Sequence, residues 1–299
     1  MQGRAPTASC SGWRGGSIPP PLGRPGRPSL AISNAPASSC RRGACAARAC
    51  TKSGLTDLKG QFCLGDSTLC YPLTIADSYN CFLLSCRALT NTQVAESRPV
   101  LLRAFQEYDL PVRIRSDNGV PFATQALGRL SALSVRWIRL GILPDFVEPA
   151  SPQQNGRHER MHRTLKRDCT RPPRHSRRAQ QHGFDTWRDE FNTLRPHEAL
   201  DDATPASHYT ASPRPYPARL PALEYPGHYE IRRVSYNGGI RWHKQWVNIS
   251  QTLGGEYIGL VEIDDGEWDV YFGPLRLGRF HEGTLQVEDA LGRRYRRRY

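Results

Sequence analysis

Between residues 55 and 204, the hydrophobic positions follow two different periods along the chain. Runs rich in apolar and branched side chains predict strands at 55–63, 70–76, 81–86, 112–116 and 145–148. Apolar positions three and four residues apart predict helices at 91–107, 122–140, 152–168 and 184–192. Three strands followed by alternating helices and strands predict an α/β domain, built as a mixed five-stranded sheet with helices on both faces.

The pattern changes from Tyr229 onward to short strands separated by turn residues. Asn237-Gly238-Gly239 and Asp264-Asp265-Gly266 are tight-turn sequences, and each lies between two short apolar segments. They predict two hairpins. Short strands at this spacing favour a small β-barrel within residues 228–288.

Segments without hydrophobic periodicity divide the remaining chain. Residues 170–182 are basic and polar, which predicts a linker. Residues 205–227 are rich in proline and predict a second, extended linker. Residues 289–299 contain an arginine run and form a basic tail, which is typical of a mobile solvated end or of phosphate contacts on DNA.

Residues 1–54 contain no Asp or Glu, but they contain seven Arg and seven Pro. Apolar side chains there are too sparse to offset the entropy of ordering, so we expect a disordered basic low-complexity segment. Three origins remain open: a basic arm that grips DNA, an organelle transit peptide, or an alternative start or shifted reading frame. Cys40, Cys45 and Cys50 are evenly spaced, but the first histidine is His158, which argues against a zinc site.

Charge narrows the classes of partner. The net charge is +13 and the sequence pI is about 9.6, which favours a polyanion, most often nucleic acid and sometimes an anionic membrane. A GC-rich coding sequence is the alternative explanation, since 37 of the 41 basic residues are Arg. No run of 18 apolar residues predicts a membrane span. Nine cysteines without a paired framework favour a reducing compartment.

Three acidic residues fall at the ends of predicted elements. Asp57 lies in the first strand, Asp117 follows the fourth strand, and Glu159 lies about two turns into the helix that starts at Pro152. Strand ends and helix starts converge on one crevice of an α/β sheet, where three carboxylates repel one another unless a cation lies between them. Oxygen ligands suit Mg²⁺ or Mn²⁺, and two such ions can promote chemistry at a phosphodiester. Solvated surface charges are the alternative.

The residues around these acids carry a resemblance. The segments are 57–62, 114–122 (with Arg-Ser-Asp-Asn-Gly), 152–160 (with Gln-Asn-Gly-Arg-His-Glu) and 192–200, which has the pattern Asn-x-x-Arg-Pro-His. In this order they resemble the DDE integrase-core family, which comprises retroviral-type integrases and bacterial insertion-sequence transposases. The resemblance covers about 57–212 and extends more loosely over the β-rich end.

The resemblance implies a ribonuclease-H-like fold with a catalytic core at 55–204 and a small DNA-binding barrel at 228–288. It implies that Asp57, Asp117 and Glu159 hold two Mg²⁺ or Mn²⁺ ions and carry out DNA strand cleavage and strand transfer. It further implies a homo-oligomer on the element ends and target DNA, in the bacterial cytoplasm and on the nucleoid. Neither a nucleotide cofactor nor a membrane is expected, and no Gly-x-x-x-x-Gly-Lys-Ser/Thr loop occurs.

Several residues are expected to contact DNA. Asn155 lies four residues before Glu159, and Arg163 and Lys166 share the helical face of Glu159 because they follow it by four and seven residues. For Trp242 both core packing and DNA contact stay open. The expected set is Asn155, Arg163, Lys166, Trp242, Arg293 and Arg294.

The chain departs from the family before Asp57. Polar residues replace the apolar and aromatic side chains that usually precede the first aspartate, and residues 1–54 do not predict a helix-turn-helix. We therefore expect an N-terminal truncation or frameshift, and a catalytically inactive relic that only binds DNA is the main alternative function. A nuclease for RNA–DNA hybrids shares the expected fold, but segment 192–200 and the β-rich end argue against it.

Overall fold

The computed structural model describes residues 53–58, 60–147 and 156–294. The predicted disorder of residues 1–54 therefore concerns a segment that lies almost wholly outside the described residues. The strands of the first sheet are β1 (Ser53–Leu58), β2 (Phe62–Cys63), β3 (Leu69–Asp77), β4 (Leu83–Leu89), β5 (Arg113–Ser116) and β6 (Leu143–Phe146).

The first sheet has five main strands in the order β4-β3-β1-β5-β6, and the short β2 pairs with the start of β3. Strands β1, β5 and β6 are parallel, whereas β3 is antiparallel to both β1 and β4. This arrangement confirms the predicted mixed five-stranded sheet. The sequence did not separate β2 from β1, because both lie in one predicted strand at 55–63.

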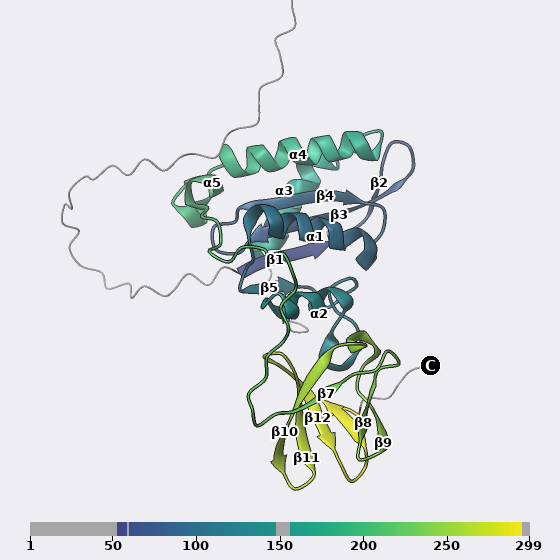
Figure 1. The fold of residues 1–299 in the computed structure, drawn as a ribbon. Helices are drawn as coiled ribbons and strands as arrows, with labels where there is room; N and C mark the ends of the chain where they lie inside the picture. Colours follow the sequence, from purple (N-terminus) through teal and green to yellow (C-terminus); the bar gives the residue numbers. More distant parts are fainter. Residues whose placement is uncertain (1–52, 59, 148–155, 295–299) are drawn as a thin grey trace, which may run out of the picture. The chain divides into compact units, whose positions relative to one another are not determined.

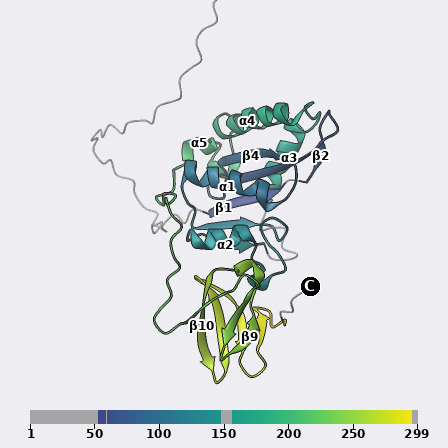
Figure 2. The ribbon, with the colours of Figure 1, turned by 45° about the vertical axis from the view of Figure 1, so that its right-hand side comes forward.

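Helices cover both faces of this sheet, as predicted (Figures 1 and 2). Alternate residues of β3 face opposite sides, so Leu73 and Ile75 pack with α1 and α2, while Cys70 and Ala76 pack with α3 and α4. Among the residues that the structure describes, none of the helices combines the length and the apolar character that a membrane span requires. The helices are α1 (Val94–Tyr108), α2 (Ala132–Arg139), α3 (Gly156–Cys169), α4 (Arg177–Thr193) and α5 (Pro205–His208).

Two helix boundaries differ from the prediction. The predicted helix at 122–140 begins only at Ala132, because Ser131 and Ser134 form a capping box and a 3₁₀ turn with Gly128 at φ 67° precedes it. Helix α4 starts within the predicted linker 170–182, after the Ser176 cap. The polar pattern there hid a buried Gln180, which donates to the carbonyl oxygen of Cys169 at 2.9 Å.

The C-terminal strands form an open antiparallel sheet in the order β13-β12-β11-β10-β7, and β8 and β9 form a separate hairpin. The described residues contain no closed barrel, so the predicted β-barrel is wrong in this respect. The strands are β7 (Glu230–Arg233), β8 (Gly239–Trp242), β9 (Gln245–Asn248), β10 (Tyr257–Asp264), β11 (Glu267–Phe272), β12 (Leu275–His281) and β13 (Gln286–Asp289).

One of the two predicted hairpins is confirmed. Strands β10 and β11 pair through the turn at Asp264-Asp265-Gly266. The turn at Asn237-Gly238-Gly239 does not join a hairpin, because β7 pairs with β10 instead. The observed hairpin is β8–β9, whose turn residues His243 and Lys244 both have positive φ.

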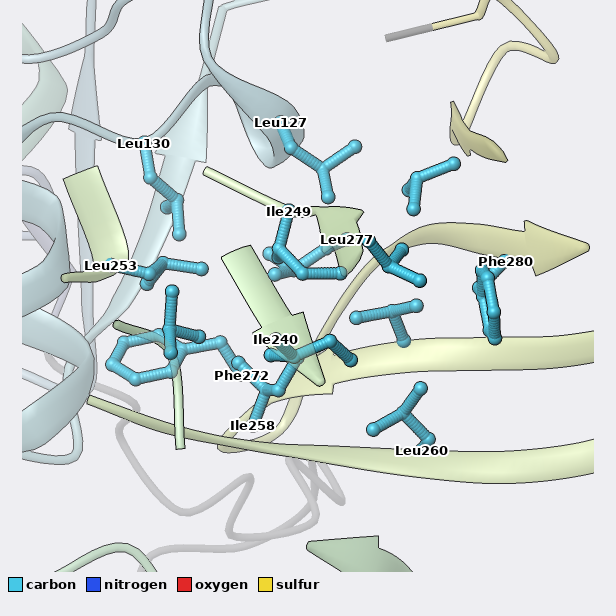
Figure 3. Packing of buried hydrophobic residues seen from close by; sticks show 14 of the residues in the cluster. Leu127, Leu130, Ile240, Ile249, Leu253, Ile258, Leu260, Phe272, Leu277 and Phe280 are labelled. Carbon is cyan, nitrogen blue, oxygen red and sulfur yellow. The ribbon is translucent and has the colours of Figure 1, made fainter. Parts of the chain in front are cut away.

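The C-terminal sheet and the 127–138 segment of the first domain share one hydrophobic cluster, and both belong to the same compact unit. Leu127 and Leu130 lie beside Ile249 and Leu277 of the C-terminal strands (Figure 3). Gly128 approaches so closely that a Cβ there would lie 2.6 Å from Leu277 Cδ2. The turn before α2 thus supplies packing surface to the C-terminal sheet.

Candidate active site

Asp57 and Asp117 are positioned by two neighbouring parallel strands. Thr56 of β1 pairs with Ser116 of β5, so the two aspartates are the next residues at the same end of the paired strands. Asp57 is the penultimate residue of β1, and Asp117 directly follows β5. The sheet register therefore brings these two predicted site residues to the same edge.

The Asp117 carboxylate lies in a partly closed environment. Burial raises its pKa above the ordinary value, and a hydrogen bond from the backbone N–H of Gly119 partly offsets this effect. Its Oδ1 atom is buried and has no hydrogen-bond partner among the described residues. A Cβ at Gly119 would lie 3.1 Å from Asp117 Oδ2, so glycine permits the close approach of this loop.

Helix α3 has one face packed on the sheet and one face in solvent. His158, Met161, His162 and Leu165 are buried, in the spacing of a single helical face. Glu159, Arg163 and Lys166 are exposed and follow the same i, i+4, i+7 spacing, which places them together on the solvent side. Glu159 is therefore available to ligands, and the two basic side chains share its face as expected.

A cluster that the sequence did not predict connects α3 to β1. His158 Nε2 and His162 Nε2 lie 2.8 Å and 2.7 Å from the Thr74 hydroxyl, and His162 Nδ1 lies 3.6 Å from Asp57 Oδ2. Thr74 is the register partner of Asp57, so both side chains lie on the same face of the sheet. Asp57, His158 and His162 offer ligand atoms within 4.8 Å of one another.

Among the described residues, this close group contains neither Asp117 nor Glu159. The structure thus gathers Asp57 with two histidines of α3 and places Asp117 beside it by register, while Glu159 lies one residue from His158. Two features of the sequence could have identified the histidines. They have i, i+4 spacing on either side of Glu159, and a polar Thr74 occurs inside an otherwise apolar strand.

Comparison with known proteins places these features in a family. A family of integrase core domains matches residues 140–205. An uncharacterized insertion element IS136 protein of Agrobacterium fabrum is 31% identical over 140 residues, which is 44% of this chain and 69% of that protein. An IS136 protein of Agrobacterium tumefaciens matches with the same identity and coverage. The chain belongs to the integrase-core family of insertion-element transposases.

Retroviral integrases of known structure are similar at lower identity. The chain of a simian T-cell lymphotropic virus intasome has 17% identity and a TM-score of 0.45, with 76% of this chain and 77% of that chain covered. The HTLV-2 integrase catalytic core domain, solved in complex with magnesium, has 14% identity and a TM-score of 0.36, with 52% and 93% covered. The integrase-core fold expected here is ribonuclease-H-like, and the mixed sheet with helices on both faces agrees with it.

The residues of the Asn-x-x-Arg-Pro-His pattern make structural contacts in this integrase core. The Asn192 side chain donates to the carbonyl oxygen of Leu83 at 3.0 Å and accepts from its N–H at 2.8 Å, which fixes α4 to the start of β4. His197 packs edge-on against Phe191, with ring centroids 4.8 Å apart, and burial lowers its pKa. Asn192 therefore holds α4 against the sheet, and His197 packs the segment after α4 onto the helix.

The arginine of the same pattern connects α4 to the end of α3. Arg195 donates to Asp168 at 2.6 Å, and Arg167 and Trp187 donate to the same carboxylate. Burial acts to raise the pKa of Asp168, but the three hydrogen bonds outweigh it and lower the pKa to about 2. Asp168 is thereby an ionised anchor for the C-terminal end of the α3 helix.

The other residues predicted to bind DNA lie in varied environments. Asn155 lies outside the described residues. Trp242 is 3% exposed and packs on Trp268 and Phe280, the core alternative that the sequence left open. Arg293 pairs with Asp289 at 2.8 Å, and Arg294 lies 3.8 Å from Glu288. The DNA contacts of these four residues stay a prediction.

Proposed function

We propose that this integrase-core chain catalyses metal-dependent DNA strand cleavage and strand transfer during transposition. The observation that carries the proposal is the pairing of Thr56 with Ser116, which sets Asp57 and Asp117 side by side at one end of parallel strands. The family match supports it, since the related proteins belong to insertion elements. In this proposal Asp57, Asp117 and Glu159 are the metal ligands.

The residues present fit a hard divalent cation. Carboxylate oxygens are the ligands that Mg²⁺ and Mn²⁺ prefer, and the buried Oδ1 of Asp117 lacks any other partner among the described residues. Asp57 would hold the cation from β1, Asp117 from the end of β5, and Glu159 from the exposed face of α3. When bound, a pair of such ions supplies activation of the attacking oxygen and stabilisation of the leaving oxygen at a phosphodiester.

The protein's own groups position the DNA. Arg163 and Lys166 are exposed on the face of Glu159, where they would bind the phosphates that flank the reacting bond. Cleavage frees a 3′-hydroxyl at the element end, and this hydroxyl then attacks a phosphodiester of the target. Because one phosphodiester replaces another in the joining step, no nucleotide cofactor is needed. We also propose that the chain acts as a homo-oligomer on paired ends, at the nucleoid of a bacterial cytoplasm.

The direct test is a joining assay on oligonucleotides that carry the element's end sequence, with Mg²⁺ or Mn²⁺. Glu159→Gln should abolish cleavage and joining while DNA affinity stays nearly intact. Glu190→Gln, at an exposed acid of α4, is the matched control and should retain wild-type activity. Equal joining by Glu159→Gln and wild type contradicts the assignment, and a wild type that binds DNA but neither cuts nor joins supports the inactive alternative.

The proposed DNA contacts of α3 can be tested separately, through the salt dependence of binding. Binding should weaken steeply with salt, and Arg163→Ala or Lys166→Ala should each reduce the slope of log K against log salt by about 1. Light scattering of the protein with and without end DNA tests the proposed oligomer.

A further inference from the structure

We propose that the Thr74 hydroxyl is the positioning group of the candidate active site. It holds His158 and His162 so that α3 stays fixed beside Asp57, and it thereby sets the arrangement in which Asp57 and Glu159 take up a divalent cation. The inference rests on the proposed function and deepens it, because it identifies a non-ligand residue on which cation affinity depends.

The contacts converge on one oxygen. Thr74 is fully buried on β3, and the Nε2 atoms of two residues one helical turn apart lie within 2.8 Å of its Oγ1. The rings of His158 and His162 meet edge to face, with centroids 4.4 Å apart, and both are at most 3% exposed. Sheet and helix are therefore joined here by polar contacts within an apolar surface, directly opposite Asp57 in the register.

Three polar atoms surround the Thr74 hydroxyl. Besides the two imidazole nitrogens, its Oγ1 lies 3.3 Å from the carbonyl oxygen of Asp57, to which the hydroxyl can donate. A hydroxyl has one proton to donate and two lone pairs that accept, so it can serve all three partners at once. Thr74 therefore contacts both the α3 helix and the backbone of Asp57.

This arrangement gives each residue a role. His162 brings its Nδ1 atom to 3.6 Å from Asp57 Oδ2, and His158 fixes the helical turn that carries Glu159. Both rings contact the same hydroxyl. A valine at this position matches the shape of threonine but leaves two buried imidazole nitrogens without this partner.

The same group could instead hold a transition metal, since two histidines and an aspartate are common ligands. Both Nε2 atoms are engaged with Thr74 in the structure, which favours the positioning role. A separate calorimetric titration with Zn²⁺ tests this alternative, and zinc uptake that requires both histidines overturns the inference.

The test compares full-length Thr74→Val and Thr74→Ser, with Thr56→Val as the matched control. Thr56 is 2% exposed on the adjacent strand, and its hydroxyl has no partner among the described residues. Calorimetric titration with Mn²⁺ alone should show affinity lowered roughly 10- to 100-fold in Thr74→Val. Thr74→Ser and Thr56→Val should remain close to wild type, and raising Mn²⁺ should recover joining by Thr74→Val.

A second measurement does not depend on metal binding. The ¹⁵N shifts of the His158 and His162 rings should change in Thr74→Val and should stay close to wild type in Thr74→Ser and Thr56→Val. Ring shifts that are unchanged in Thr74→Val overturn the inference, as does Mn²⁺ affinity that is equal in Thr74→Val and wild type or equally weakened in Thr74→Ser. A wild type that binds no Mn²⁺ overturns the proposed function as well, whereas a wild type that binds, with Thr74→Val equal to it, overturns this inference alone.

Discussion

Asp117→Asn should stabilise the metal-free protein while it removes activity. The Asp117 carboxylate is partly buried, and its Oδ1 has no partner among the described residues. A buried polar group without a partner costs about 1–3 kcal/mol, and more when it is charged. An asparagine oxygen can still accept from the N–H of Gly119, and the amide NH2 takes the unpartnered position without a charge. Because only the charge is removed and this side chain is only partly buried, we expect the free energy of unfolding to rise by about 1 kcal/mol.

The stability gained in Asp117→Asn should depend on pH in a definite direction. Burial raises the pKa of Asp117 in the folded state above its ordinary value, so the folded protein binds this proton more readily than the unfolded chain. The destabilisation of the wild type by the charged Asp117 side chain is absent below the pKa of this group in the unfolded chain. It grows as pH rises from there and is complete above the raised pKa of the folded state. The stability difference between Asp117→Asn and wild type should therefore be largest at neutral pH and should shrink toward pH 4.

Thermal melts in EDTA across this pH range measure the effect, at roughly 2–4 °C per kcal/mol for a chain of this size. Mg²⁺ should then stabilise the wild type but not the variant, because only the wild type has all three of the proposed carboxylate ligands. Asp269→Asn is the control and should lower the stability instead of raising it, because Arg276 donates to the Asp269 carboxylate at 2.7 Å. An Asp117→Asn variant that is no more stable than wild type at pH 7 in EDTA refutes this reasoning.

Three further predictions concern the supporting structure. Asn192→Ala should lower stability by about 2–4 kcal/mol in urea unfolding, because both backbone groups of Leu83 lose their partner. Gly128→Ala should lower the melting temperature, since φ is 67° and the new Cβ would lie 2.6 Å from Leu277 Cδ2; an unchanged melt would contradict this close packing. Asp168→Asn should be less stable than wild type at pH 7. That deficit should vanish as pH falls from the ordinary carboxyl range to about 2, the pKa of the folded group, which acid titration monitored by circular dichroism can follow.

Periodicity was a good guide to the first sheet because its strands and helices bury continuous apolar faces. Helix α1, predicted at 91–107, is observed at Val94–Tyr108. The errors arose where polar residues are buried. Gln180 begins the buried face of α4 but reads as linker, and the 3₁₀ turn before α2 contains apolar residues that serve the C-terminal cluster rather than a helix.

The C-terminal sheet shows a different limit of prediction from sequence, which concerns strand pairing. Turn sequences indicate where a chain can reverse, but pairing depends on which strands share a buried face. The turn at 237–239 is present, yet β7 pairs with β10 from further along the chain. Trp242 shows the same dependence, because only the packing with Trp268 and Phe280 decides between core and surface.

The candidate site divides along the two faces of α3. The motif around Glu159 indicated the exposed face, because the family's motifs occur in a recognisable order along the chain. The buried face was not predicted in this way, since His158 and His162 contact Thr74, more than eighty residues earlier. Glu159 lies between a residue anchored to β3 and one that faces Asp57. A helix that presents a carboxylate to a cation must itself be held against the sheet, and here two imidazoles and one hydroxyl provide that hold.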